Sequence, residues 1–135
     1  MNPFLMPLQM VAFYAAINAL IMIVLGMLVV RARVRTRTEI GDGGDPALLG
    51  PLRAHANNTE YVPLAIVLMM LLYALDASVI VIHVVGVTLT LGRLLHAVGL
   101  TRNVGTSAGR LAGMVLTWLA YIIAIVVTLW LALQG

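Results

Sequence analysis

The sequence contains no cysteine and no lysine, and both absences restrict the chemistry open to the protein. Without cysteine there is no disulfide, no thiolate metal ligand and no protein thiol nucleophile. Any sulfur chemistry must therefore come from a ligand. Because lysine is missing, all eight basic residues are arginines. Arginine keeps its charge when partly buried and binds carboxylates through two nitrogens.

Acidic residues are also few, five against the eight arginines, which leaves a net charge of +3 and a pI near 10.0. In a soluble protein this balance favours nucleic acid as a partner. Here 62% of the residues are hydrophobic and the mean hydropathy is +1.06. A soluble domain of 135 residues cannot bury that much apolar surface. We therefore predict a membrane protein with no nucleic-acid partner, in which the arginines act as topology signals.

Four apolar runs separated by three polar connections predict an all-α integral membrane protein. We expect a single domain over residues 1–135, built as a bundle of four transmembrane helices. The helices are expected at about residues 8–35, 47–75, 77–98 and 107–133. Asp45 before Pro46 is typical of a helix cap followed by a favoured first helical residue. Residues 99–109, which include three glycines, are expected to form the last connection. No basic residue precedes the long first apolar run, so we expect no cleavable signal peptide.

The arginines gather on one side of the predicted membrane protein. All of them lie in, or close to the ends of, the first and third connections. The one charged residue in the second connection is Asp76. Connections rich in arginine stay on the cytoplasmic side. We therefore predict that the connections between helices one and two and between helices three and four are cytoplasmic. Both termini are expected on the opposite side.

Polar side chains in residues 52–63 form the head of an apolar helix, where ionisable groups usually need a partner or a water-filled cavity. Arg53, Asn57 and Glu60 follow one another at i, i+4 and i+7, so they share one helix face. Together they offer a guanidinium, an amide and a carboxylate, which suit a small zwitterionic ligand. The predicted topology puts further polar residues of the helix ends at the same depth: Arg31, Arg93, His96 and Arg110.

Glu60 allows two interpretations. It can form a structural ion pair with Arg53 or Arg93, a common packing device. Alternatively, the four arginines at this end of the bundle repel one another unless an anionic group lies between them. We favour this second, ligand-binding interpretation.

The remaining polar residues of the apolar runs are expected to hold helices together and not to bind a metal or a ligand. Three scattered histidines without cysteine make a poor metal site, so no metal is expected. His83 and Asn18 are expected to form hydrogen bonds between helices. Gly109 and Gly113 have the spacing that lets two helices approach closely. A small multidrug exporter needs an acidic residue inside the first helix, and this sequence has none there.

Two motifs resemble a known family. Residues Arg53-Ala-His-Ala-Asn57-x-x-Glu60-Tyr61-x-Pro63 are similar to the second-helix signature of the membrane-associated proteins in eicosanoid and glutathione metabolism, the MAPEG family. Gly92-Arg93-x-x-His96 resembles the third-helix motif of that family. The four-helix layout agrees over essentially the whole chain. The closest resemblance is to the short bacterial members of the inner membrane, which implies termini in the periplasm.

The resemblance implies a homotrimer that binds glutathione between neighbouring subunits near the cytoplasmic face. Arg31 of a neighbouring subunit would reach this site. The residues that would hold glutathione are Arg31, Arg53, Asn57, Glu60, Tyr61, Arg93 and His96. Arg110 matches an arginine at the head of the fourth helix that would stabilise the catalytic thiolate, because a nearby cation favours the thiolate over the thiol. Leu100 and Ala56 replace a tyrosine and an arginine of certain family members, which argues against an eicosanoid enzyme.

The predicted function is that of a membrane-bound glutathione transferase or glutathione-dependent peroxidase acting on lipophilic electrophiles that enter from the bilayer. Glutathione is the expected ligand, as a substrate. One alternative is a non-catalytic membrane protein of the same fold that binds lipids or a partner. A less favoured alternative is a small transporter, which predicts gradient-dependent flux that collapses in the Glu60→Gln variant.

Overall fold

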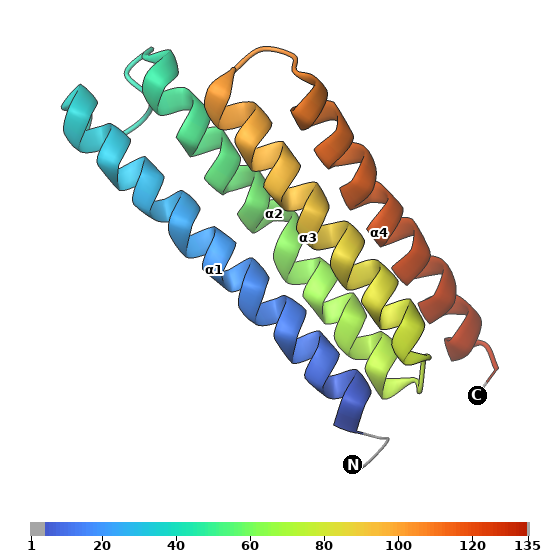
Figure 1. Cartoon of the computed structure of the whole chain (residues 1–135). Coiled ribbons are helices and arrows are strands. Elements are labelled where there is room, and N and C mark those ends of the chain that lie inside the picture. Colours follow the sequence, from blue (N-terminus) through green and yellow to red (C-terminus); the bar gives the residue numbers. More distant parts are fainter. Residues whose placement is uncertain (1–4, 135) are drawn as a thin grey trace.

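The computed structural model describes residues 5–134 and contains four helices arranged side by side (Figure 1). The helices are α1 (Leu5–Thr36), α2 (Pro46–Ala74), α3 (Val79–Arg102) and α4 (Ala108–Ala132). The short turn between α2 and α3 lies at the end of the bundle where α1 begins and α4 ends. The two arginine-rich connections lie together at the other end (Figure 1). The predicted four-helix fold is confirmed.

Polar caps define where three of the helices begin. The Asp45 carboxylate accepts a hydrogen bond of 2.8 Å from the backbone nitrogen of Ala47, as the sequence predicted for the start of α2. The Ser78 hydroxyl caps α3, and the Ser107 hydroxyl accepts from the backbone nitrogen of Arg110 at 3.2 Å. These side chains satisfy backbone donors that the first helical turn leaves free.

The end of α3 differs from the prediction. The sequence placed it at residue 98, but the helix continues through Gly99 to Arg102. Gly99 lies inside the helix, at a point where α3 and the start of α4 are in close contact. A Cβ at this position would collide with the backbone nitrogen of Arg110. A glycine on a helix face in contact with another backbone is tolerated because tertiary contacts outweigh its low helix propensity.

Three of the helices, α1, α3 and α4, are long and apolar enough to cross a membrane. The second helix falls short of this because its first half carries the polar residues 52–63. It lies alongside the other three in the same bundle (Figure 1). The chain is therefore a multi-pass membrane bundle in which one helix is partly polar.

The four helices pack with α2 and α3 in the middle. Within residues 5–134, α1 contacts only α2 and α3, and α4 contacts the same two helices, so the two flanking helices do not meet. One apolar cluster, which includes Val11, Met69 and Leu89, fills the end near the α2–α3 turn. A second, smaller cluster around Leu25 and Leu100 fills the opposite end.

Buried polar side chains separate the two apolar clusters. Along their helices, Asn18, Asn58 and Thr90 each lie between residues of the two clusters. The Asn18 amide donates to the Thr90 hydroxyl at 2.9 Å, and the Tyr14 hydroxyl lies 2.8 Å from Nδ1 of His83. The predicted interhelical hydrogen bonds of Asn18 and His83 are therefore confirmed, and both join α1 to α3.

Glycines allow α3 and α4 to approach closely. A Cβ on Gly113 would collide with the backbone nitrogen of His96 and the carbonyl oxygen of Gly92. A Cβ on Gly109 would meet its nearest atom, the Leu95 carbonyl oxygen, at 3.3 Å. The predicted close approach at Gly109 and Gly113 is confirmed, and it is much tighter at Gly113.

This difference predicts effects of different size for two single-methyl changes. Gly113→Ala is expected to lower the stability of the bundle by about 1–3 kcal/mol, because the methyl group forces the two backbones apart. Gly109→Ala is the matched control, and it is expected to cost much less, because the Leu95 carbonyl, 3.3 Å from the added methyl group, has to move by only a few tenths of an ångström. Thermal unfolding of the purified variants in detergent measures both. Equal midpoints for the two variants would contradict the packing described here.

Candidate functional site

Arg93 is the centre of a buried polar network that joins three helices. Its side chain, on α3, is only 1% exposed. Nε and one terminal nitrogen donate to the hydroxyl of Thr117 on α4 at 3.0 and 2.6 Å. The other terminal nitrogen donates to the side-chain oxygen of Asn57 on α2 at 2.7 Å. Thr117 in turn donates to the Gly113 carbonyl at 2.8 Å. One guanidinium thus ties α2, α3 and α4 together.

Two tyrosines cover this network. The Arg93 guanidinium carbon lies 5.3 Å from the centre of the Tyr61 ring, a distance at which a cation is attracted to an aromatic face. The Tyr121 hydroxyl on α4 donates to the backbone carbonyl of Tyr61 at 2.5 Å, and the two rings meet edge to face. Tyr61 therefore already has a structural contact in a single copy of the chain.

The acceptors that Arg93 uses are neutral. An amide oxygen, a hydroxyl and the thioether of Met114, 3.5 Å away, surround its guanidinium. Glu60, which the sequence offered as its ion-pair partner, is exposed on α2. A buried charge with only neutral partners depends strongly on each hydrogen bond it makes. The network is therefore sensitive to loss of any one acceptor.

The predicted ligand-binding residues separate into a buried group and an exposed group. Asn57 and Tyr61 are half-buried, and Arg93 and His96 are buried, His96 at 3% exposure against α4. The side chains of Arg53, Glu60 and Arg31 are exposed. Arg31 lies on α1, which does not contact α4 within the described residues, so a single copy does not bring Arg31 to Arg110.

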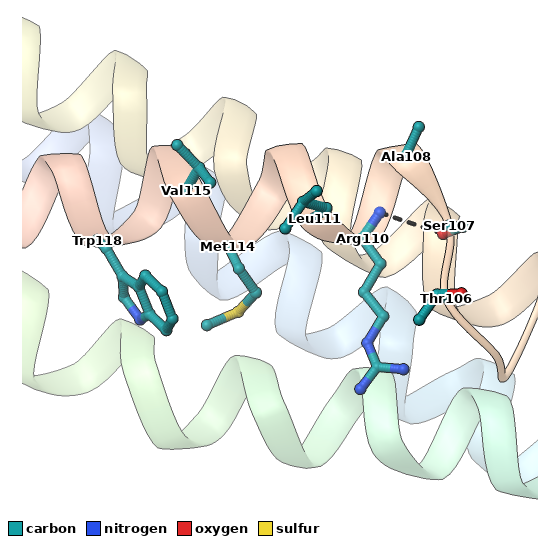
Figure 2. A pocket seen from close by; sticks show the side chains of 8 residues that line it. All are labelled: Thr106, Ser107, Ala108, Arg110, Leu111, Met114, Val115 and Trp118. Atoms are coloured by element: carbon teal, nitrogen blue, oxygen red, sulfur yellow. Dashed lines mark hydrogen bonds between the residues drawn. The ribbon is translucent and has the colours of Figure 1, made fainter.

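An apolar hollow of about 480 Å³ runs along α4. Figure 2 shows that Arg110, Met114 and Trp118 extend from the same side of the helix, toward the side on which α2 lies in this view. The half-buried Arg110 side chain donates to the carbonyls of Val104 and Gly105 at 3.4 and 3.3 Å. The hollow is lined by Thr106, Ser107, Ala108, Arg110, Leu111, Met114, Val115 and Trp118.

The hollow and the buried network meet at Met114. This side chain lines the hollow and its sulfur contacts the Arg93 guanidinium. The hollow therefore combines an apolar wall, which accepts a lipophilic molecule, with one cation at its polar end. Such an arrangement can hold an anionic group next to an apolar one.

Comparison with known proteins gives the family. The family model of the MAPEG family matches residues 11–130. The chain belongs to the MAPEG family. The inner membrane protein YecN of Escherichia coli K12 is 36% identical over 119 residues, which cover 88% of this chain and 89% of the relative. The same protein of Escherichia coli O6:H1 gives the same values.

Membership in the MAPEG family confirms the resemblance seen in the two helix motifs. The family match includes every candidate residue from Arg31 to Arg110. In this MAPEG chain the second-helix motif lies on α2 and the third-helix motif on α3. Asn57 and Arg93, one from each motif, form the 2.7 Å hydrogen bond at the centre of the buried network.

Three further residues of α4 belong to the candidate site of this MAPEG chain and were not predicted from the sequence. Thr117 binds Arg93, Tyr121 binds the backbone of Tyr61, and Met114 links the hollow to the network. A signal was present: Gly113, Thr117 and Tyr121 recur at every fourth residue of an otherwise apolar helix, which puts them on one face. Polar residues in line with a close-packing glycine indicate the face of the helix that contacts protein.

Proposed function

We propose that this protein binds glutathione, or a similar anionic thiol, beside the apolar hollow of α4 and joins it through its sulfur to lipophilic electrophiles from the bilayer. The observation that carries the proposal is the position of Arg110. Its guanidinium is the cation at the polar end of an apolar hollow, and Met114 connects that hollow to the buried network of Arg93. Membership in the MAPEG family supports the same conclusion.

Arg110 is the group proposed to activate the thiol. A cation within ~4–6 Å favours the thiolate, which is the nucleophilic form of sulfur. In a transferase, the thiolate forms a carbon–sulfur bond with the electrophile, and the leaving group departs with the electron pair. In a peroxidase, two thiols reduce a lipid hydroperoxide to an alcohol and water and become a disulfide. The loop carbonyls now bound by Arg110 are weak competitors for an anion.

The exposed residues of α2 are proposed to hold the charged ends of the peptide. Arg53 suits a ligand carboxylate, and Glu60 suits the ligand amine, because charge-assisted hydrogen bonds are the strong ones. Asn57, Tyr61, Arg93 and His96 form the wall behind the ligand. We infer that a neighbouring copy in a homotrimer supplies Arg31, since one copy does not bring Arg31 to Arg110.

The proposed location is the bacterial inner membrane, as for the relative YecN. The connections α1–α2 and α3–α4 are proposed to be cytoplasmic and both termini periplasmic, because the arginines gather at one end of the bundle. Because the chain has no cysteine of its own, labelling of single introduced cysteines tests this topology. A single cysteine at Ser78, in the α2–α3 turn, should react in intact cells with a maleimide that cannot cross the inner membrane. One at Gly43 should not, and the reverse pattern would overturn this topology.

Titration of the purified protein with glutathione tests the proposed function. We expect a saturable thiolate band in the ultraviolet difference spectrum at neutral pH, where free glutathione is almost entirely thiol. Glycine, glutamate and an S-methylated glutathione are the controls, and none of them can give a thiolate. Absence of binding in both the spectrum and calorimetry would reject the proposal.

A non-catalytic binder of lipophilic molecules is the second candidate. It is favoured by the hydrogen bonds that Arg110 already makes to the α3–α4 connection, which give this residue a structural role. In that case glutathione, if bound at all, would show heat of binding without a thiolate band. The same titration therefore separates the two candidates.

A further inference from the structure

A second groove lies between α1 and α3, and the start of α2 also lines its arginine-rich end. It consists of two hollows that meet at Leu28 and Thr101, since both residues line both of them. The apolar hollow has a volume of about 270 Å³ and extends from Leu20 to Thr101. The second hollow, of about 300 Å³, lies at the arginine-rich end of α1 and is lined by Arg31 and Arg35.

Arg31 and Arg35 line this groove, whereas Arg33 and Arg37, at the same end of α1, do not. Arg31 and Arg35 are four residues apart, so they share the face of α1 that lines the groove. Arg33 is engaged elsewhere, because it donates to the carbonyls of Thr38, Glu39 and Gly41 at 2.9–3.1 Å. Arg37 is exposed and does not line the groove. The arginines could act only as a signal for membrane orientation, but that signal depends on how many basic residues lie near a helix end. It does not explain why two of them line the same groove.

The length of the groove matches one leaflet of a bilayer. Arg31 follows Leu20 by eleven residues, which is about 16 Å along a helix at 1.5 Å per residue. Half of a ~30 Å hydrocarbon core is about 15 Å. Leu20 therefore lies near mid-membrane when Arg31 and Arg35 lie at the depth of the lipid headgroups. No acidic residue lines either hollow within the described part of the chain.

We propose that this groove binds one anionic phospholipid of the leaflet next to the α1–α2 connection. An acyl chain lies between α1 and α3 along Val24 and Val98, and the phosphate binds the guanidinium groups of Arg31 and Arg35. Basic pockets between membrane helices recognise anionic headgroups in this way. The groove is separate from the hollow of α4, because α1 and α4 do not meet in residues 5–134. Arg31 also belongs to the proposed glutathione site, so the test depends on Arg35.

Native mass spectrometry of the purified protein tests this proposal with phosphatidylglycerol and phosphatidylcholine of identical acyl chains. We expect the wild-type protein to bind phosphatidylglycerol more tightly. Arg35→Gln should weaken that binding about five-fold. It should weaken phosphatidylcholine less, because that headgroup carries the phosphate but no net charge. Arg37→Gln is the matched control: it removes the same charge two residues away and should retain wild-type affinity.

A second pair of variants tests the apolar part of the groove. Val24→Trp should fill the space between α1 and α3 and weaken both lipids, whereas Ile23→Trp, on the exposed face outside the groove, should weaken neither. Equal binding of the two lipids by the wild-type protein would overturn the proposal. So would equal losses in Arg35→Gln and Arg37→Gln, or displacement of phosphatidylglycerol by inorganic phosphate.

Discussion

Asn57→Leu is expected to lower the free energy of unfolding by about 3 kcal/mol, one of the two largest effects predicted for this protein. The change removes the oxygen that Arg93 binds at 2.7 Å and leaves a guanidinium that is 1% exposed without that partner. A hydrogen bond to a charged group contributes about 1.5–3 kcal/mol, and the loss is at the upper end here because water cannot reach the guanidinium to replace it. Thermal or denaturant unfolding in detergent measures the loss.

The neighbouring residue is a matched control with the opposite expected sign. Asn58 is 2% exposed, and neither polar atom of its side chain has a hydrogen-bond partner among the described residues. Burying an unpaired amide is costly, so Asn58→Leu should be neutral or stabilising by about 1–2 kcal/mol. If both leucine variants lose the same stability, the Arg93 network does not have the role assigned to it.

A double variant separates the lost charge partner from a general packing defect. Replacing Arg93 as well, as Asn57→Leu with Arg93→Met, removes the stranded charge together with its acceptor. Apolar replacement of a whole buried ionic group is often neutral or stabilising. We therefore expect the double variant to be more stable than Asn57→Leu alone. A simple sum of the two single effects would show that the residues are not coupled.

Arg110→Ala is expected to abolish the thiolate band of bound glutathione and to lower turnover about 10²-fold or more, as for loss of one stabilising group at a reacting centre. Affinity for glutathione should fall much less, because other residues hold the peptide. The remaining activity should rise with pH toward the pKa of a free thiol, about 8.5, since the variant depends on spontaneous ionisation. The wild-type rate should already be level in that range.

Arg102→Ala is the control for this prediction. Arg102 ends α3 and is exposed, so the variant removes one positive charge at the same end of the bundle without touching the hollow of α4. It should retain the thiolate band. Retention of the band in Arg110→Ala, or equal loss in both variants, would exclude Arg110 as the activating group.

The four apolar runs and the cap at Asp45 were sufficient to predict four helices. Asp45 and Pro46 marked the start of α2 correctly because capping depends on local residues alone. The end of α3 was predicted four residues early. Gly99 resembles a helix breaker in sequence, and only its contact with the backbone of Arg110 shows why the helix continues.

The sequence did not indicate which of the predicted site arginines is buried. Arg53 and Arg93 both stand among polar residues at helix ends, yet one is exposed and the other is 1% exposed. In a soluble protein an apolar stripe shows which face is inside. In a membrane the outward face is apolar as well, so the pattern loses this information. The sequence therefore indicated the depth of these residues and could not indicate their direction.

The central position of α2 has a consequence for how the protein is made. The second helix contacts all three others, and it is the one whose first half is too polar to partition into lipid by itself. Its amide Asn57 meets Arg93 of α3, and the hydroxyl acceptor of Arg93, Thr117, belongs to α4, which is synthesised after both. Stable insertion of α2 therefore waits for its neighbours. For α2, crossing the bilayer and packing against the other helices are therefore coupled.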